Sequence, residues 1–327
     1  MRTCWVLDHP AHVRLLAPFI RSGTTSDVLI ATNRTEVRQL MDSSEGVLPK
    51  RQLIWVERPV GKKRLRVAWK RMREVHSFLN SAQRSGEKIE RIVSVGAPLE
   101  LRIAKKMKIP KRWYITDTEI NHLAHKLAAN KATDVVVPTH WNSSIDGGWL
   151  EKFNKKAAVH RLDGLHGMVH IRPQLRPKQV AGTPKIAVRR LIGDGVHDSA
   201  EILEIPDTLL DGIESMRADE GQYSGDPWEF LSMISMQDGV LSQSVTVASE
   251  AVLMGVPTLL VSNAERGFLD RLVSDGYPLF RLRSGDNIEE IHAQFLAGLH
   301  LTDALELPEW PDVRQQFAEI IGSELID

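Results

Sequence analysis

Short apolar runs alternate with longer amphipathic stretches along most of the chain, and this alternation constrains the fold more than any other feature. The short runs, rich in β-branched residues, predict buried strands. The stretches between them carry apolar residues at every third or fourth position and predict helices. Strands that alternate with helices indicate βαβ units, parallel sheets and right-handed crossovers. We therefore expect an α/β protein with doubly wound parallel sheets.

The first half of the chain contains more predicted elements than the second. Its strands are 3–7, 27–32, 53–56, 91–95, 112–116, 133–138 and 157–161, and its helices are 11–22, 34–42, 64–82, 98–108, 119–130 and 141–154. The second half contains strands 185–191, 239–242, 258–261 and 279–282 and helices 246–254, 264–275, 287–299 and 311–323.

The segment 172–184, R-P-Q-L-R-P-K-Q-V-A-G-T-P, interrupts this rhythm with prolines and a glycine and has no apolar period, so it is typical of a linker. A chain of 327 residues is long enough for two cores. We predict an N-terminal Rossmann-like domain over 1–171 and a C-terminal Rossmann-like domain over 185–327. Ligands of open α/β sheets bind at the carboxyl ends of strands, so a cleft between the two domains is expected to hold the ligand.

Composition excludes several classes of protein. Lys+Arg and Asp+Glu both number 42, and this zero net charge argues against a nucleic-acid binder. The single cysteine, Cys4, excludes an intramolecular disulfide and a cysteine-based zinc site. No apolar run approaches the roughly 18 residues of a membrane span, and the N-terminus lacks the pattern of a signal peptide. These features predict a cytoplasmic protein.

An acid and two histidines stand where the first predicted strand gives way to a helix. Asp8 ends the strand, and His9 and His12 follow around Pro10, which suits the first turn of a helix. Amides at a helix N-terminus attract anions, and a histidine there can exchange a proton with a sugar hydroxyl. Helix capping by Asp8 or His9, with His12 in solvent, explains the same residues without a function.

Two other polar groups lie in the first half. Asp117 and Glu119 follow a strand in W-Y-I-T-D-T-E, where carboxylates can serve as a general base, hold hydroxyls or simply cap a helix. His166 lies in L-D-G-L-H-G-M-V-H, close to the predicted linker, and is a candidate acid or base. The spacing of His166 and His170 suits a metal site on a helix, but the flanking glycines disfavour a helix, so no metal is expected.

The second half contains two candidate nucleotide-binding segments. Arg189, near the end of a strand, is placed to neutralise a diphosphate, and Asp194 and His197 would lie on the loop that follows. Charged loop residues that are merely solvated explain this segment equally well.

The most specific pattern in the chain is L-S-Q-S-V-T-V-A-S-E-A-V-L-M-G-V-P, residues 241–257. A strand ends, a helix begins near Thr246, and a Gly-Val-Pro turn closes it. Ser244 and Thr246 would offer hydroxyls at the helix N-terminus, where amides also bind phosphate. Glu250, one turn further, would accept hydrogen bonds from ribose hydroxyls.

Residues 61–73 contain seven basic residues and no acid. The basic residues are Lys62, Lys63, Arg64, Arg66, Lys70, Arg71 and Arg73. Leu65, Trp69, Met72 and Leu79 fall roughly on one helical stripe, which is predicted to face the core. The basic face is either simply solvated or a surface for an anionic lipid or a polyanionic acceptor, which would make the protein peripheral at a membrane.

The order of these motifs resembles the uncharacterised family called domain of unknown function 354, found widely in archaea. The motifs are D-H-P-A-H-V, V-S-V-G-A-P, D-T-E, D-G-L-H, an R…D…H-D run and T-V-A-S-E-A-V-L-M-G-V-P. That family is similar to the GT-B superfamily, which includes UDP-N-acetylglucosamine 2-epimerases and a lipid-linked N-acetylglucosaminyltransferase. The resemblance implies two Rossmann-like domains, a nucleotide sugar as substrate, with UDP as the expected nucleotide, and no further cofactor.

The resemblance also implies roles for individual residues. Glu250 would hold the ribose and Thr246 the diphosphate, while the N-terminal groups at Asp8, His9, His12, Asp117 and Glu119 would face the sugar or the acceptor. The family tends to have a glycine pair before the threonine, where this chain has Ser244 and Val245, and an acid where this chain has Gly167. Val245 resists the positive φ that glycine permits, which predicts a poorer approach of the diphosphate.

We expect a glycosyltransferase of GT-B type that uses a nucleotide sugar. A UDP-N-acetylglucosamine 2-epimerase-like enzyme is the alternative within enzymes. A non-catalytic binding protein on the same fold is the alternative outside them.

Overall fold

The computed structural model describes residues 1–171, 183–191, 201–299 and 308–325. Asp194, His197 and most of the predicted 172–184 linker lie outside these residues. The chain divides into two compact units, one made of Met1–His170 with Pro311–Asp327 and the other of Ile171–Trp310.

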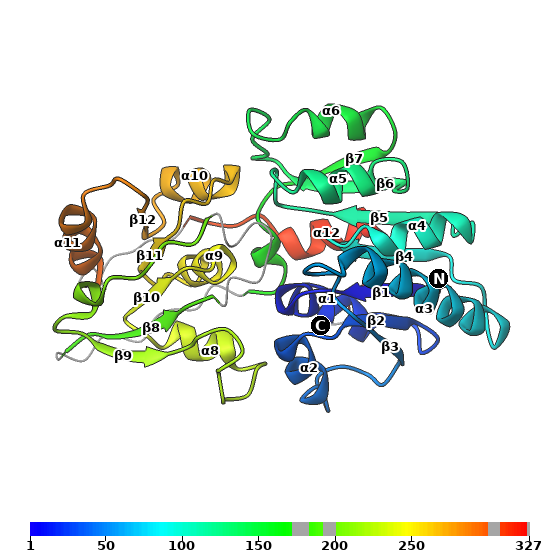
Figure 1. The fold of residues 1–327 in the computed structure, drawn as a ribbon, viewed down its shortest axis with the longest axis horizontal. Helices are drawn as coiled ribbons and strands as arrows, with labels where there is room; N and C mark the ends of the chain where they lie inside the picture. Colours follow the sequence, from blue (N-terminus) through cyan, green and yellow to red (C-terminus); the bar gives the residue numbers. More distant parts are fainter. Residues whose placement is uncertain (172–182, 192–200, 300–307, 326–327) are drawn as a thin grey trace. The chain divides into compact units, whose positions relative to one another are not determined.

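Unit 1 is built on a seven-stranded sheet with the order β3-β2-β1-β4-β5-β6-β7 (Figure 1). Every pair of neighbouring strands in it is parallel. The strands are β1 (Thr3–Leu7), β2 (Val28–Thr32), β3 (Gln52–Val56), β4 (Arg91–Val95), β5 (Lys111–Ile115), β6 (Asp134–Pro138) and β7 (Ala158–Leu162). The chain order reverses between β1 and β4, which is the switch point where ligands of doubly wound sheets bind.

Helices connect these strands. They are α1 (Pro10–Ser22), α2 (Thr35–Asp42), α3 (Arg64–Arg84), α4 (Leu99–Lys106), α5 (His122–Ala128) and α6 (Trp149–Asn154), followed by a 3-10 turn, η1 (His166–Val169). None of the described helices combines the length and the hydropathy that a membrane span requires.

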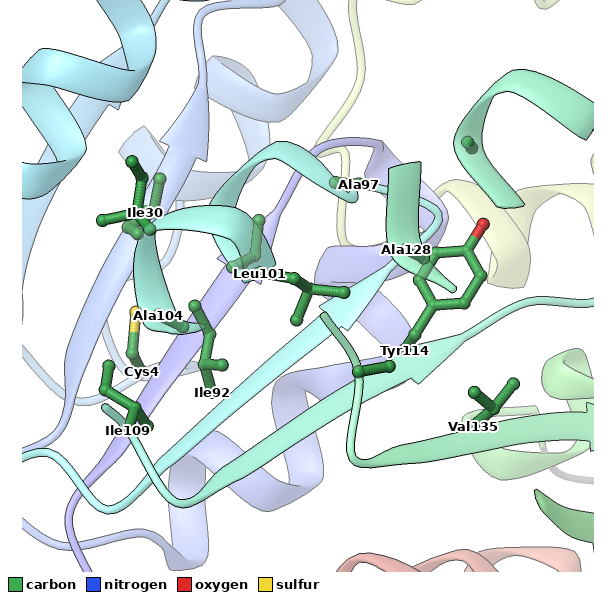
Figure 2. Packing of buried hydrophobic residues seen from close by; sticks show 14 of the residues in the cluster. Cys4, Ile30, Ile92, Ala97, Leu101, Ala104, Ile109, Tyr114, Ala128 and Val135 are labelled. Carbon is green, nitrogen blue, oxygen red and sulfur yellow. The ribbon is translucent and has the colours of Figure 1, made fainter. Parts of the chain in front are cut away.

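The core of unit 1 forms between the sheet and the helices that cover it. Figure 2 shows Cys4, Ile30 and Ile92, from three neighbouring strands, together with Leu101 of α4 and Tyr114 of β5. All five are fully buried. Burial of an aliphatic side chain of this size contributes about 1.5–3 kcal/mol. The near-continuous apolar strands are those expected of a parallel sheet covered on both faces.

The final helix, α12 (Val313–Ile321), belongs to unit 1, although the sequence predicted it as part of the second domain. It packs on β7 and η1, and the Phe317 ring lies 5.1 Å from the ring of Phe19. Arg91 donates to the carbonyls of Ile321, the last residue of the helix, and of Gly322, which follows it. The amphipathic pattern of α12 predicts that one face is buried, but it does not identify the unit against which that face packs.

A second prediction is corrected at residues 143–148, which form turns, so the helix predicted over 141–154 begins only at Trp149. Asp146 organises them by accepting hydrogen bonds from the Trp141 indole at 2.9 Å and from the amides of Gly148 and Leu150 at 2.6 and 3.0 Å. Gly147 and Gly148 have φ of 63° and 74°, and this left-handed conformation interrupts a right-handed helix at these residues.

Unit 2 contains a five-stranded parallel sheet with the order β12-β11-β10-β8-β9. The strands are β8 (Lys185–Arg189), β9 (Glu214–Arg217), β10 (Gly239–Ser242), β11 (Thr258–Val261) and β12 (Leu279–Leu282). The described helices are η2 (Asp207–Leu210), α8 (Phe230–Ser235), α9 (Val245–Leu253), α10 (Gly267–Ser274) and α11 (Ile288–Leu299). The sequence did not predict β9, a largely exposed edge strand without an apolar run, or the six-residue α8.

Candidate functional site

Four titratable side chains of unit 1 meet at the carboxyl edge of its sheet. Asp8 follows β1, Asp117 follows β5, and His12 and His166 come from α1 and η1. The charges that act on His12 are those of Asp8, Asp117 and His166, together with Arg34. Parallel neighbouring strands place their carboxyl ends at one edge, so residues more than a hundred positions apart are brought together here. We call Asp8, His12, Asp117 and His166 the edge cluster.

Asp8 is an ionised anchor of this cluster. Thr32 Oγ1, at the end of β2, donates to Asp8 Oδ1, and Arg71 Nη2 lies 3.0 Å from the same oxygen. Burial by itself would raise the pKa of Asp8, but the Arg71 charge and the Thr32 hydrogen bond outweigh it and hold the pKa well below its usual range. Asp8 is therefore a fixed negative charge at neutral pH.

Arg71 lies inside the molecule and not on the basic surface where the sequence placed it. Its side chain is 3% exposed, and its Nε lies 2.6 Å from Oε1 of Glu100, which is 1% exposed. The two carboxylates of Glu100 and Asp8 raise the pKa of Arg71 despite the opposing effect of burial. Arg71 therefore connects α3 to α4 and to the edge cluster, and its cation does not contribute to the surface.

Asp117 and His166 form a carboxylate–imidazole pair. His166 Nδ1 lies 3.4 Å from Asp117 Oδ2, and Thr118 Oγ1 donates to Asp117 Oδ1 at 3.1 Å. Burial would raise the pKa of Asp117, but the adjacent His166 and the hydrogen bonds hold it well below its usual range. The other ring nitrogen, His166 Nε2, is buried and has no hydrogen-bond partner among the described residues. This nitrogen is placed to bond a ligand.

His12 is kept neutral. Desolvation lowers its pKa to about 4, although the nearby charges of Asp8 and Asp117 act in the opposite direction. Its Nδ1 is likewise buried without a hydrogen-bond partner in the described part of the chain. Gly96, in the turn after β4, has a φ of 60°, and a Cβ built on it would touch the His12 ring at 3.6 Å. That contact distance is ordinary, so the positive φ of the turn, and not lack of space beside the ring, is what favours glycine here.

His9 and Glu119 both make structural contacts, and for His9 the contact is the helix capping that was predicted as the alternative to a functional role. His9 is the N-cap of α1, and its Nδ1 accepts from the amide of Ala11 at 3.3 Å. Glu119 is fully buried, and its Oε1 accepts from the amide of Asn142 at 3.0 Å. Glu119 therefore supports the turn after β6, and Asp117 alone of the two carboxylates joins the edge cluster.

In unit 2, the strand–helix junction of β10 and α9 has the predicted form. Ser244 caps α9 in an extended conformation (φ −86°) and accepts from the amide of Val247 at 3.3 Å. Val245 begins the helix, and Lys108 is the only non-glycine residue in the described part with a positive φ. Because this junction needs no left-handed residue, Ser244 and Val245 fit it without strain. Thr246 is half-buried in the first turn and Glu250 is buried one turn later.

Arg189 differs from its prediction. It is 6% exposed, and its Nη1 donates to the carbonyl of Ala218 at 2.9 Å. Its guanidinium also lies 5.6 Å from the centre of the Phe230 ring. Arg189 therefore braces β9 and α8 inside unit 2 and is not presented to a diphosphate.

Sequence reasoning missed three polar residues that hold these sites. Thr32 and Arg71 fix Asp8 in unit 1. Gln243 follows β10, accepts from the amide of Leu191 at 2.8 Å and donates to the carbonyl of Leu203 at 2.7 Å, so it ties two loops together. Thr32 ends a predicted strand and Gln243 directly follows one, which is the signal that could have identified them. Arg71 gave no such signal among six other cations.

Among the residues that the structure describes, no three His, Cys, Asp or Glu side chains are arranged to hold a metal ion.

No protein-family model and no curated relative matches the chain, so its resemblance to domain of unknown function 354 stays a prediction. Solved structures do match. A Listeria monocytogenes protein assigned as a UDP-N-acetylglucosamine 2-epimerase is 10% identical with a TM-score of 0.66, and the match covers 98% of this chain and 95% of that one. The UDP-N-acetylglucosamine 2-epimerase of Neisseria meningitidis, bound to UDP-N-acetylglucosamine, is 13% identical with a TM-score of 0.59, over 98% and 99%.

A UDP-glucosyltransferase of Polygonum tinctorium is 12% identical with a TM-score of 0.54, and the match covers 99% of each chain. At these low sequence identities, the matches to epimerases and to a glycosyltransferase show a shared backbone fold and nothing more. The chain therefore has a GT-B-like fold, with two α/β domains that each contain a parallel sheet.

Proposed function

We propose that this protein is a glycosyltransferase that uses a nucleotide sugar, with a UDP-sugar as the donor. The observation that carries the proposal is the Asp117–His166 pair, which lies beside the neutral His12 at the carboxyl edge of a sheet. Support comes from the fold, since solved proteins with this fold include a UDP-glucosyltransferase and an epimerase bound to UDP-N-acetylglucosamine. Membership in the predicted family fits the same proposal.

In this mechanism His166 is the general base. The ionised Asp117 accepts from Nδ1–H of His166, which leaves the lone pair on Nε2. Nε2 takes the proton from the acceptor hydroxyl as its oxygen attacks the anomeric carbon of the donor. Asp117 then stabilises the imidazolium that forms, as a carboxylate does for a catalytic histidine in acyl transfer.

The other two members of the edge cluster orient the sugar or the acceptor. His12 stays neutral above pH about 4, so it can both donate and accept a hydrogen bond at neutral pH. Asp8 is held by Thr32 and Arg71, and a carboxylate fixed in this way accepts from sugar hydroxyls without loss of side-chain freedom.

The nucleotide half of the donor binds to unit 2 in this proposal. The first turn of α9 directs its amides and the Thr246 hydroxyl toward the diphosphate, and Glu250 accepts from the ribose. Amides at a helix N-terminus stabilise the negative charge that develops on the departing diphosphate. Because Arg189 is engaged elsewhere, the amides and the helix dipole supply this stabilisation.

The first test is a melting experiment with UDP-, GDP-, CMP- and dTDP-sugars. A ligand at a hundred times its dissociation constant stabilises the folded state by about 2.7 kcal/mol. We expect the melting temperature to rise with one nucleotide class. The rise should be lost in Thr246→Val and Glu250→Gln and retained in Ser249→Ala, whose hydroxyl donates to the carbonyl of Thr246 within α9. If no nucleotide sugar raises the melting temperature of the wild type, the proposed function is wrong.

The second test separates transfer from epimerisation. Epimerisation needs an acid and a base, and the two histidines of the edge cluster, His12 and His166, could also supply these. An epimerase converts its donor without an acceptor and, when run in ²H₂O, exchanges the hydrogen at C2. Deuterium at C2 of the recovered sugar nucleotide would replace the transferase proposal with the epimerase one. Binding without turnover, with any acceptor offered, would indicate a binding protein.

A further inference from the structure

The first ten residues of α3 and the residues just before it expose an unusual combination of side chains. Six cations are solvent-exposed there: Lys62, Lys63, Arg64, Arg66, Lys70 and Arg73. Between them Leu65 is 81% and Trp69 is 59% exposed, and Val60 before the helix is 42% exposed. We call these nine residues the α3 surface. No acid interrupts residues 61–73, although the whole chain has no net charge.

Leu65 and Trp69 were predicted to face the core with Met72 and Leu79, but the structure exposes both of them, whereas Leu79 is buried as predicted. Leu65, Trp69 and Arg73 follow one another at four-residue spacing and therefore share one face of the helix. The Arg73 guanidinium lies 4.7 Å from the centre of the Trp69 ring. The buried face of α3 is instead made by Arg71, Val75, Leu79 and Ala82. Two large apolar side chains thus remain in water on the same side as the cations.

The start of α3 is also electrostatically unfavourable in the free protein. Its N-cap residue, Lys63, makes no side-chain capping bond, and the first turn contains no acid. A helix N-terminus carries partial positive charge from its unpaired amides, so cations there repel the dipole and anions are favoured. A negatively charged partner would relieve this repulsion, whereas cations at a helix C-terminus would need no such partner.

The α3 surface is connected to the edge cluster through the same helix. Arg71, which bonds Asp8, lies seven residues after Arg64, or about 10 Å along the helix axis. The N-terminus of a crossover helix lies on the carboxyl side of its sheet, which is also the side of the edge cluster. A partner held at the α3 surface would therefore be close to the proposed catalytic groups.

We propose that the α3 surface binds an anionic lipid bilayer. The lysines and arginines contact lipid phosphates, and Leu65 and Trp69 enter the interfacial layer, where tryptophan is favoured. A soluble polyanion would satisfy the cations but would leave Leu65 and Trp69 in water. In the context of the proposed function, this surface identifies the acceptor as a molecule held at a membrane. The binding itself does not depend on that function.

The test is sedimentation of the full chain with vesicles of phosphatidylcholine alone or with 30% phosphatidylglycerol, a composition chosen for the assay. We expect binding only to the anionic vesicles, with affinity that falls as salt is raised. Each cation near a membrane surface contributes roughly tenfold in affinity or somewhat less. The variant Lys62→Gln/Lys63→Gln/Arg66→Gln is therefore expected to bind about a hundredfold more weakly.

A matched control removes the same number of exposed cations from α4, as Arg102→Gln/Lys105→Gln/Lys106→Gln, and is expected to bind like the wild type. Trp69→Phe should still bind anionic vesicles but should lose the part of the quenching by brominated lipids that comes from Trp69 in the bilayer. Leu65→Ser/Trp69→Ser should lose binding. Circular dichroism checks that every variant is folded.

Absence of binding to anionic vesicles at low salt would overturn the proposal, and so would equal loss in the α3 and α4 variants. Binding to polyphosphate but not to vesicles would show a soluble polyanion site instead. If the protein bound anionic vesicles but no nucleotide sugar changed its melting temperature, the membrane-binding proposal would stand and the proposed function would be rejected.

Discussion

Arg71 offers the sharpest test of the structure, because its side chain links two carboxylates inside unit 1. The change Arg71→Met keeps the volume and the apolar stem but removes the cation that pairs with Glu100 at 2.6 Å and Asp8 at 3.0 Å. Removal of one partner from a buried ion pair leaves an uncompensated charge and costs about 3–5 kcal/mol. For a unit of this size the melting temperature should fall by roughly 10 °C.

Intrinsic fluorescence during urea or heat unfolding is a suitable assay, because six tryptophans belong to unit 1 and two to unit 2. Arg66→Met is the matched control, since it removes an exposed cation from the same helix and should change stability by about 0.5 kcal/mol at most. Adding Glu100→Gln to Arg71→Met should restore part of the loss, because the buried charge is then removed.

The pH dependence of the same variant is a second check. In the wild type the depressed pKa of Asp8 contributes stability that is present at neutral pH and lost as the pH falls below its usual value of 3.8. Without Arg71 the pKa of Asp8 rises, because burial loses its strongest opposing influence. The difference in unfolding free energy between the wild type and Arg71→Met should therefore become smaller as the pH falls through about 4. If Arg71→Met lost no more stability at pH 7 than Arg66→Met does, about 0.5 kcal/mol, the buried ion-pair network would be refuted.

Three further predictions concern other parts of unit 1. Burial lowers the pKa of His125 from 6.5 to about 4, so between these pH values the unfolded chain binds a proton there that the folded chain does not. The free energy of unfolding should therefore fall by up to about 3 kcal/mol as the pH is lowered from 6.5 to 4. Denaturant titrations of His125→Gln should show a shallower fall. His166→Gln should lower kcat by about 10²–10⁴-fold and leave nucleotide-induced melting shifts unchanged, while Asp117→Asn should lower kcat with the same binding; a loss of binding in either variant would contradict their assignment to the acceptor side. A Cβ at Gly164 would lie 2.4 Å from Cγ2 of Val313, so Gly164→Ala should loosen α12 and expose its amides to hydrogen exchange before those of β1.

Local patterns predicted the strands well because a parallel sheet buries both faces of each strand. The run Thr3–Leu7 is apolar along nearly its whole length and is fully buried, so its identity needs no partner to be recognised. β9 has no such run, because an exposed edge strand is held by its ladder with β8. Loops organised by one side chain, such as that around Asp146, depend on contacts that helical periodicity does not contain.

The sequence by itself determined which segments become strands and helices and which polar residues end the strands of the sheets. It placed Asp8 and Asp117 after strands, His12 at the start of a helix and His166 close to the predicted linker, because alternation and turn chemistry act over a few residues. Only the tertiary structure decided that Asp117 pairs with His166 while Glu119 turns inward, that Arg189 is engaged inside its unit, and that Arg71 is buried while Leu65 and Trp69 are exposed. The physical reason is that a pattern defines the faces of a helix or strand, whereas the neighbours packed against each face determine which one is buried.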